Sequence, residues 1–377
     1  MKKIINYFAL ILLPINMFVI LKYYSKILES EIILFHNKRQ GFGNQFTSAD
    51  LMRIIYPRKK KLIILFDQKK RHNNYIYSLF NQDCIVIKTL IEFKFFNREI
   101  KLGEYDERNN LNSLPDINFY IYPQQYILYQ FLKLLININC KILSINDLYN
   151  QSWQKYKKKK QNNINIPYQH RMEVSYKYLR ENNINNYKVK FSKKNKKKIT
   201  KLIPKKLFKN KNKIAFYLRK RSKLNDPKDS GNFNNYVPSL KYLSKKNYLV
   251  FLIGDIENIL INNKIKNIYT YRDFSISKKL YDLLFASECK YFIGTGGGGQ
   301  WFGHYKKKYL LIDDFPYNNI YKEITLFKKI YKKNKILSKK DCMKKFIFKN
   351  ETFFKKNKFL IKPNSSNQVK KFISNTF

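Results

Sequence analysis

Short apolar segments alternate with longer segments of helical periodicity along most of this chain. Apolar runs bounded by polar or turn-forming residues are typical of strands in a sheet that is covered on both faces. In the first part of the chain the pattern predicts strands at residues 32–35, 62–66, 84–87, 119–122 and 141–144, with helices at 45–55 and around 125–136. This alternation indicates a Rossmann-like α/β domain over residues 30–150.

The same alternation starts again in the second half of the chain. It predicts strands at residues 214–218, 249–253, 267–270, 291–293 and 309–312, with helices at 236–245, 276–287 and after Gln300. Strands that are connected through helices pair in parallel with right-handed crossovers. We therefore expect a second Rossmann-like domain, with a doubly wound parallel sheet, over residues 212–331.

Two other segments are less regular. Residues 151–211 contain an expected helix at 168–180 and two lysine runs, and we interpret them as a bridge between the domains. Residues 332–377 form a basic C-terminal tail. Two α/β domains that face each other leave a cleft between them, and such a cleft is the expected place for a ligand.

The N-terminal segment, residues 4–21, is uncharged and strongly apolar. A helix needs about 20 such residues to cross the hydrocarbon core of a membrane. The residues that follow offer no small-residue cleavage site, so we predict an uncleaved membrane-anchor helix over residues 1–24. Pro14 and Asn16 weaken a helix and leave an interfacial segment as the alternative. Lysines after the segment favour the inner membrane, with the body of the protein in the cytoplasm.

The charge of the chain is very unequal, with 76 Lys and Arg against 26 Asp and Glu. Such an excess attracts phosphate groups, including those of nucleic acids. Here, however, the lysines extend from Lys2 to Lys371 together with many Asn, Ile, Tyr and Phe residues, as in the product of an AT-rich gene. The charge therefore predicts adhesion to anionic lipids and phosphate-bearing substrates, and it does not single out nucleic acid as a partner.

The strongest local signal for chemistry is a glycine run that follows the apolar segment 291–293 and precedes an expected helix. Glycines let a phosphate approach the backbone closely, and the N–H groups at a helix start favour an anion. No Lys-Ser/Thr pair follows the glycines, so the run is not a Walker A loop. A flexible turn is the alternative. The predicted phosphate-binding residues are Thr295, Gly296, Gly297, Gly298, Gly299 and Gln300.

Other candidate ligand-binding residues follow predicted strands of the same domain. Arg219 comes directly after the strand 214–218, where α/β folds place ligands, and its guanidinium can bind phosphate through paired donors. In so basic a chain, the alternative is that Arg219 is an ordinary surface residue. Asn232 and Asn235 belong to a polar loop, where they are suited either to ligand binding or to helix capping. We expect no metal ion and no cofactor, and we interpret Asp313-Asp314 as a turn or capping cluster.

The N-terminal domain has a weaker signal. The loop Gly41-Phe42-Gly43-Asn44 follows the first predicted strand, and its residues Gly41, Gly43 and Asn44 are candidates for a ligand-binding glycine loop, with a tight turn as the alternative. His36 lies between that strand and the loop. It is the best-placed candidate for a catalytic base, although a packing role is common for such a histidine.

Residues 214–317 resemble a bacterial family of glycosyltransferases associated with surface polysaccharides, which is distantly similar to fucosyltransferases of the GT-B fold. The similarity lies in Leu218-Arg219, in the loop 231–236, in the strand that ends at Gly254-Asp255, and in residues 280–299. Gly41-Phe42-Gly43-Asn44-Gln45 also resembles the glycine loop of fucosyltransferase-like enzymes. The resemblance adds Gly254 and Asp255 to the candidate donor-binding residues. This sequence departs from the family where Lys220, Asn234 and Leu252 stand at positions usually held by an acid and two arginines.

The resemblance implies a metal-independent glycosyltransferase with two Rossmann-like domains in a GT-B arrangement. The C-terminal domain would hold the nucleotide-sugar donor, and the N-terminal domain would present a glycan or lipid-linked glycan acceptor at the membrane. Lys220, Arg221 or Lys223 would replace the missing family cations. Two alternatives remain: a non-catalytic glycan- or nucleic-acid-binding protein on the same fold, and another sugar-modifying enzyme such as a pyruvyl transferase.

Overall fold

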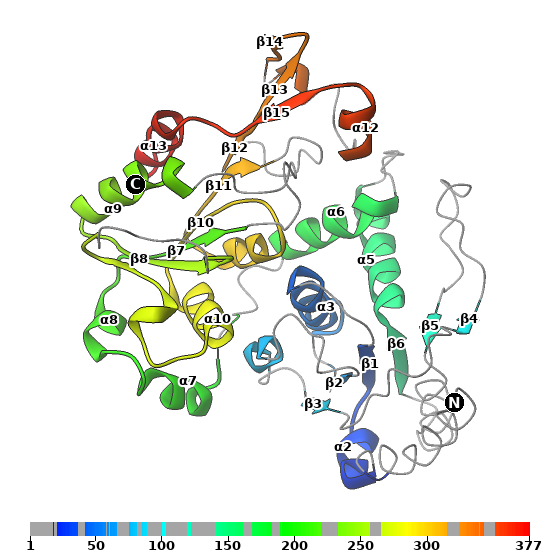
Figure 1. Ribbon diagram of the computed structural model, residues 1–377. Coiled ribbons are helices and arrows are strands. Elements are labelled where there is room, and N and C mark those ends of the chain that lie inside the picture. Colours follow the sequence, from blue (N-terminus) through cyan, green and yellow to red (C-terminus); the bar gives the residue numbers. More distant parts are fainter. Residues whose placement is uncertain are drawn as a thin grey trace, which may run out of the picture. The chain divides into compact units, whose positions relative to one another are not determined.

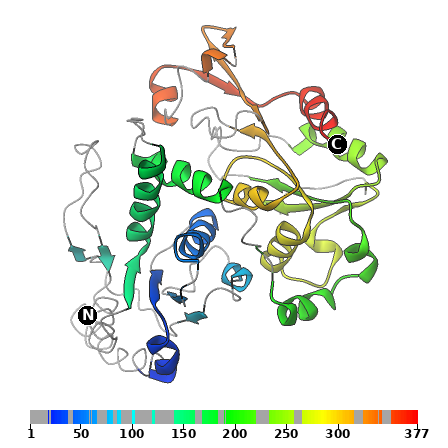
Figure 2. The ribbon, with the colours of Figure 1, turned by 180° about the vertical axis from the view of Figure 1, so that it is seen from behind.

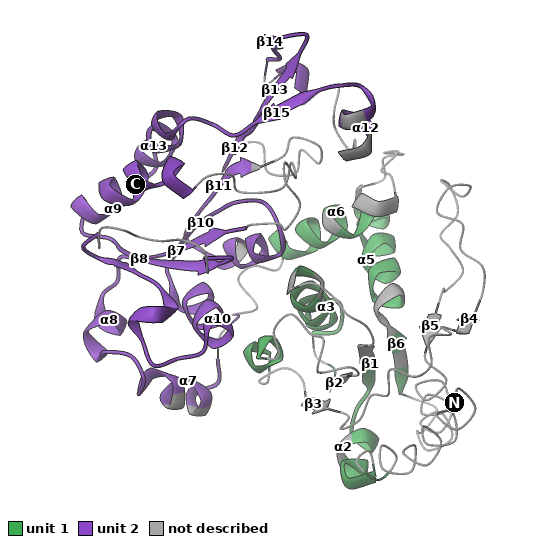
Figure 3. Cartoon of the chain, in the orientation of Figure 1, with its two compact units in different colours: residues 1–183 green, residues 184–377 purple. Residues whose placement is uncertain are grey.

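The chain folds into two units, residues 1–183 and 184–377, which are described separately below (Figure 3). Their boundary falls inside the segment that we interpreted as a bridge. The computed structural model describes residues 18, 21–36, 42–57, 59, 61–65, 75–80, 85–88, 100–102, 119–121, 140–160, 168–182, 189, 191–219, 233–256, 265–314, 324–338, 340–342 and 351–377.

The first unit is built on a parallel four-stranded sheet with the order β3-β2-β1-β6. Its strands are β1 (Ile32–His36), β2 (Lys61–Leu65), β3 (Ile85–Lys88) and β6 (Lys141–Ser144), each within one residue of a predicted strand. The remaining predicted strand is β5 (Phe119–Ile121), which pairs antiparallel with β4 (Ile100–Leu102) in a separate ribbon. The helix predicted around 125–136 lies outside the described residues.

The helices of the first unit contain only the first part of the segment that we interpreted as a bridge. They are α2 (Tyr24–Leu28), α3 (Phe42–Ile55), η2 (Ile76–Leu79), α5 (Ile145–Lys160) and α6 (Tyr168–Glu181). The bridge segment therefore begins within α5, which contributes buried side chains such as Trp153 to this unit. The described lysines of the last turn of α5 are exposed, because the apolar residues that pack against the unit lie on the other face of the helix.

A buried network of charges joins α3 to α6. Asp50, Arg53, Tyr176 and Arg180 are all fully buried. The Asp50 carboxylate accepts hydrogen bonds from Arg53 Nε and from the Tyr176 hydroxyl, both at 2.6 Å, and Arg180 Nε lies 3.6 Å from it. Charges that are buried together must be paired and hydrogen-bonded, so this network fixes how the two helices pack.

The second unit contains a parallel six-stranded sheet with the order β12-β11-β10-β7-β8-β9. Its strands are β7 (Lys213–Leu218), β8 (Leu249–Gly254), β9 (Ile268–Tyr269), β10 (Tyr291–Gly294), β11 (Lys308–Asp314) and β12 (Thr325–Phe327). Numbered along the chain, this is the doubly wound order 3-2-1-4-5-6. The five predicted strands are confirmed, and β12 adds a sixth.

Helices cover both faces of this sheet (Figures 1 and 2). On one face, α9 (Val237–Lys245) and α13 (Ser366–Ser374) lie side by side and bury Leu240, Leu243, Val369 and Ile373 against alternate residues of the strands. On the other face, α10 (Lys278–Glu288) stacks Phe285 on Phe251 of β8 with ring centroids 3.7 Å apart. Strands that are buried on both faces are apolar throughout, as the sequence pattern indicated.

The segment predicted as a basic tail is an ordered part of the second unit. Besides α13, it contains α12 (Glu351–Lys356) and most of an antiparallel sheet of β13 (Lys329–Lys332), β14 (Lys335–Ile336) and β15 (Leu360–Lys362), in the order β14-β13-β15. The same unit takes the second part of the predicted bridge, as α7 (Lys193–Thr200) and α8 (Lys205–Lys209). The sequence missed these elements because their apolar residues are few and widely spaced among lysines.

Asp313 ties the C-terminal segment to the sheet. One carboxylate oxygen accepts hydrogen bonds from Asn364 N at 2.7 Å and Asn364 Nδ2 at 2.6 Å, and the other accepts one from the Tyr236 hydroxyl at 2.9 Å. Asn364 Nδ2 also donates to the carbonyl oxygen of Phe327, at 2.9 Å. Burial raises the pKa of Asp313, and the hydrogen bonds oppose that change. Asp313 and Asp314 both belong to β11, so the interpretation of this pair as a turn or capping cluster is wrong.

Within the described part of the chain, no helix combines the length and the hydropathy that crossing a membrane requires. Of the predicted anchor over residues 1–24, only Phe18 and residues 21–24 belong to the described part of the chain.

Replacing Asn364 is expected to destabilise the second unit. Asn364→Ala removes both hydrogen bonds of Nδ2 and leaves a buried carboxylate with fewer donors, so we expect the free energy of unfolding to fall by about 2–3 kcal/mol. Trp301 is one of two tryptophans and lies in this unit, so its fluorescence in a Trp153→Phe background follows the unit in urea. Asn212→Ala, which removes an asparagine side chain at an exposed position of the same unit, is the control. Equal midpoints for the two variants would contradict the assigned role.

Candidate active site

The strand order of the second unit marks one place on the sheet where a ligand is expected to bind. After β7 the chain adds β8 and β9 on one side and then returns to add β10 on the other. Tyr217 of β7 pairs with Gly294, and Leu218 pairs with Gly254, so β7, β8 and β10 end at the same level. The crevice at such a reversal, outside the carboxyl ends of the strands, is the common ligand site of doubly wound folds.

The structure brings Arg219 and the glycine run together at this place. Gly297 has φ +136°, a conformation that side chains rarely adopt. A β-carbon added there would lie 2.6 Å from Arg219 Nη1 and 2.9 Å from its Cδ. The guanidinium therefore lies directly against the backbone of the loop, and a glycine is needed for this approach. Residues 78 positions apart in the chain meet because β7 and β10 are neighbours.

The backbone N–H groups of the loop are not all directed at a ligand. Thr295 N donates to the carbonyl oxygen of Tyr217 at 3.0 Å, Gly297 N to Gln300 Oε1 at 3.4 Å, and Gln300 N to the carbonyl oxygen of Gly297 at 3.1 Å. The N–H of Gly299 is bonded to the Tyr217 hydroxyl. Four N–H groups of the loop, those of Thr295, Gly297, Gly299 and Gln300, are therefore bonded within the protein. The predicted cradle is smaller than the run of glycines suggested.

Tyr217 explains two of the glycines in another way. Its ring would be 2.5 Å from a β-carbon on Gly299, and its Cβ 2.9 Å from one on Gly294. Burial raises the pKa of Tyr217 to about 12, although Arg219 and the Gly299 N–H favour the charged form. The sequence analysis did not single out this tyrosine. Its position in an apolar strand resembles that of any core residue.

The end of β8 places an acid beside this site. Gly254 has φ +94°, and a β-carbon there would lie 2.1 Å from the carbonyl oxygen of Leu218, so the turn requires glycine. Asp255 N donates to the same carbonyl at 2.9 Å. The charge of Asp255 is close enough to affect the pKa of Tyr217. Gly254 therefore turns the chain so that Asp255 directly follows β8, at the same edge of the sheet as Arg219.

Other residues from the sequence analysis have different surroundings. Asn235 belongs to η3 (Phe233–Asn235) and its Nδ2 lies 3.5 Å from the carbonyl oxygen of Asn364, which is a contact within the fold. Leu252 is fully buried in β8, where an arginine would point into the core. Asn232 and the substitute cations Lys220, Arg221 and Lys223 lie outside the described residues.

The candidate residues of the first unit are described only in part. His36 is the last residue of β1, and its side chain is outside the description, as is Gly41. The sheet order β3-β2-β1-β6 also reverses beside β1, so the end of this strand is a second switch point. Gly43 and Asn44 do not belong to a loop as predicted. Helix α3 begins at Phe42, so both lie in its first turn.

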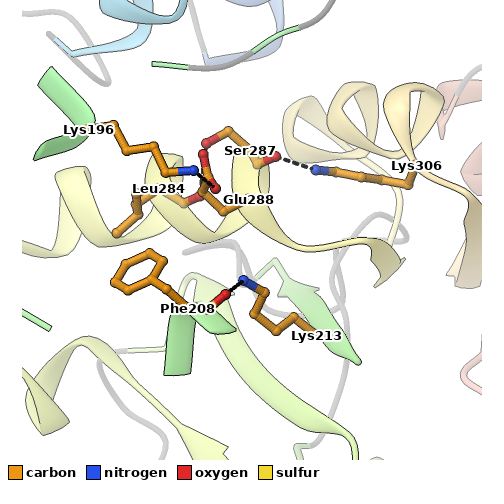
Figure 4. Close-up of polar contacts among 7 residues, drawn as sticks. All are labelled: Lys196, Phe208, Lys213, Leu284, Ser287, Glu288 and Lys306. Atoms are coloured by element: carbon orange, nitrogen blue, oxygen red, sulfur yellow. Dashed lines mark hydrogen bonds and ion pairs between the residues drawn. The ribbon is translucent and has the colours of Figure 1, made fainter. Parts of the chain in front are cut away.

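A cluster of lysines lies at the opposite, amino edge of the six-stranded sheet (Figure 4). Lys213 Nζ donates to the carbonyl oxygen of Phe208 at 3.0 Å, and Lys306 Nζ to that of Ser287 at 2.9 Å. Lys196 forms an ion pair with Glu288. Burial lowers the pKa of Lys306 to about 8 and raises that of the neighbouring Cys289 thiol to about 12. These groups hold α7, α8 and α10 to the sheet, away from the carboxyl edge.

Among the described residues, no three His, Cys, Asp or Glu side chains are gathered closely enough to hold a metal ion. The prediction of a metal-independent site remains a prediction.

No family model and no curated protein matches this chain. Among solved structures, the chain is similar to the glycosyl transferase family 9 protein from Veillonella parvula DSM 2008, with 8% sequence identity and a TM-score of 0.44, over 92% of this chain and 97% of that chain. A similarity at this level does not establish a shared activity.

The contact between Gly299 and Tyr217 predicts a specific coupling. Gly299→Ala is expected to cost about 1–3 kcal/mol of unfolding free energy, because the added methyl overlaps the Tyr217 ring. In a Tyr217→Ala background the cost should fall by at least about 1 kcal/mol. Gly303→Ala is the control, since its methyl meets Tyr309 instead and should cost the same in both backgrounds. Additive effects of Gly299→Ala and Tyr217→Ala in urea unfolding would disprove the contact.

The lowered pKa of Lys306 predicts a pH dependence of stability. Its folded-state pKa of about 8 lies below the ordinary value of 10.5, so the folded state loses the proton first as pH rises. The stabilising contribution is present at high pH and is lost as pH falls through 8. Between about pH 7 and about pH 9, the wild type should gain about 1 kcal/mol relative to Lys306→Met. The exposed Lys307→Met is the matched control for the loss of one charge. A constant difference across this range would contradict the prediction.

Proposed function

We propose that the protein is a glycosyltransferase that holds the diphosphate of a nucleotide-sugar donor at the carboxyl edge of the six-stranded sheet. The diphosphate would lie between Arg219 and the loop from Thr295 to Gln300. The observation that carries this proposal is the approach of the Arg219 guanidinium to Gly297 at the point where the strand order reverses. A cation and a backbone without side chains at that point form a site suited to phosphate.

This arrangement suits sugar transfer because of how charge develops in the reaction. As the bond between the sugar's anomeric carbon and the phosphate oxygen breaks, the nucleoside diphosphate leaves with additional negative charge. A fixed guanidinium stabilises that charge more than the charge of the intact donor. Arg219 comes directly after β7, which is paired on both sides up to Tyr217 and Leu218. We infer that Arg219 binds the leaving diphosphate and that Gly296 and Gly298 add backbone donors.

Asp255 is suited to the ribose of the same donor. In doubly wound folds an acid after the second strand commonly accepts hydrogen bonds from ribose hydroxyls. β8 is the second strand of this sheet, and Asp255 follows it directly.

The rest of the proposal concerns the acceptor. We propose a GT-B organisation in which the first unit presents a surface glycan or a lipid-linked glycan, with His36 as the candidate base that deprotonates the acceptor hydroxyl. The parallel sheet of that unit, with a switch point beside β1, supports this role. The predicted anchor would hold the protein at the inner membrane, with the catalytic body in the cytoplasm.

Arg219→Ala is expected to weaken donor binding by about 1.5–3 kcal/mol, which is about 10- to 150-fold, because a charge-assisted hydrogen bond is lost. Arg219→Lys should restore the binding only partly, since an ammonium lacks paired donors. The measurement is the thermal shift of the full chain with a panel of UDP-, GDP-, ADP- and dTDP-sugars, followed by titration of the best donor.

The controls distinguish loss of the binding site from loss of one positive charge and from loss of the fold. Lys290→Ala removes one positive charge at the amino edge of the same sheet and should leave donor affinity unchanged. Gly297→Ala keeps Arg219 but displaces its guanidinium, so it should weaken the donor as Arg219→Ala does. Donor affinity that is equal in the wild type, Arg219→Ala and Gly297→Ala would refute the proposed site. A panel in which no nucleotide sugar shifts the wild type would refute the function.

A further inference from the structure

The three-stranded sheet formed by β13, β14 and β15 has one apolar face that is covered and one that is not. Ile330 of β13 pairs with Ile361 of β15, and both contribute to a small core with Cys342 and Phe354. Because side chains alternate along a strand, the next residue of each strand points to the opposite face. The sheet continues the chain directly from the carboxyl end of β12 (Figure 1).

The register aligns three large side chains on the outer face. Tyr331 of β13 pairs with Ile336 on one side and with Leu360 on the other. Residues that pair directly in antiparallel strands lie on the same face, so these three form one continuous row across the sheet. Ile336 is 57% exposed and Leu360 is 50% exposed. Tyr331 between them is half-buried, so two exposed aliphatic side chains and a partly exposed tyrosine form one row, which is more than isolated surface residues.

Lysines border the row. Lys329 pairs with Lys362 in the adjacent position on the same face, and Lys362 Nζ lies 5.2 Å from the centroid of the Tyr331 ring. From residue 324 to residue 377 the sequence carries 16 lysines, two acids and no arginine. Of the two acids, Asp341 accepts a hydrogen bond from the Ser338 hydroxyl. The partner of this surface is therefore expected to be anionic.

We propose that this outer face, defined by Tyr331, Ile336, Leu360, Lys329 and Lys362, binds the surface of an anionic phospholipid bilayer. Aliphatic side chains enter the boundary between headgroups and acyl chains, tyrosine occupies the headgroup level, and lysines attract anionic lipids. A nucleic acid fits the row less well, because the two exposed members, Ile336 and Leu360, offer no ring on which a base can stack. The proposal is independent of the donor site and of the predicted N-terminal anchor.

The test uses the full chain and a local probe, because the predicted anchor would tether the protein to any vesicle. Leu360→Trp places an indole in the row. Leu202→Trp is the matched control, since Leu202 is a leucine of similar exposure, 47%, that also lies beside a lysine but in the turn between α7 and α8. Vesicles contain acyl chains labelled with bromine, which quench an indole that enters the bilayer. One set is phosphatidylcholine alone, and the other contains equal parts of phosphatidylcholine and phosphatidylglycerol.

On the anionic vesicles, the added fluorescence of Leu360→Trp should be quenched at least about threefold more than that of Leu202→Trp. On phosphatidylcholine the two should not differ. Lys329→Gln together with Lys362→Gln, in the Leu360→Trp chain, should remove the difference. Circular dichroism checks folding, and Ile336→Trp provides a second probe in the same row if Leu360→Trp does not fold.

Three results would overturn the proposal. The first is equal quenching of the Leu360 and Leu202 probes on anionic vesicles. The second is equal quenching of the Leu360 probe on both kinds of vesicle, which would indicate tethering by another part of the chain. The third is an emission change with a single-stranded oligonucleotide and none with vesicles, which would make nucleic acid the partner.

Discussion

The pairing of β7 with β8 on one side and β10 on the other is the constraint on which the second unit depends. All three strands run in parallel, and Tyr217 and Leu218 are in register with Gly294 and Gly254. Each strand must then be followed by a turn at the same edge. Crowding at this edge determines the residues that can stand there: Gly254 makes room for the Leu218 carbonyl oxygen, and Gly297 makes room for Arg219. The features of the proposed donor site are consequences of this register.

The two edges of the six-stranded sheet use positive charge differently. At the carboxyl edge, the Arg219 side chain lies against the backbone of Gly297, where no side chain intervenes. At the amino edge, Lys213 and Lys306 donate to carbonyl oxygens and lose part of their solvation, which lowers their pKa values. A lysine that is desolvated in this way contributes packing and hydrogen bonds to the fold rather than electrostatic attraction for a phosphate. The large net charge of the chain is thus a poor guide to where a phosphate binds.

Each unit also contains a buried aspartate that organises the segments around it. Asp50 accepts hydrogen bonds from Arg53 and Tyr176 and so fixes α3 against α6. Asp313 accepts them from Tyr236 and Asn364 and so holds α9 and the C-terminal segment at the end of β11. A buried carboxylate is tolerated only when several donors surround it, which makes the positions of those donors specific. Neither network is visible from sequence spacing, because its members are up to 126 residues apart.

The sequence by itself determined the elements of the fold that depend on local patterns. Apolar runs such as 214–218 and 249–253 become strands because they are buried on both faces, and the alternation with helices required parallel pairing. The order of the predicted strands also suggested that residues after β7 and β10 belong to one site. The amphipathic helices α5, α7 and α13 escaped prediction, because lysines and asparagines dominate their composition and the few apolar residues have a weak period.

The tertiary structure alone decided how the candidate residues are used. It brought Arg219 to Gly297, it assigned Gly294 and Gly299 to packing against Tyr217, and it directed several loop N–H groups to protein acceptors. It also turned a basic tail into an ordered sheet with an exposed apolar row. A sequence states which residue carries a group, but the neighbours of that group come from strands and turns that are distant in the chain. Their mutual approach is fixed by register, close packing and the need to satisfy buried polar groups.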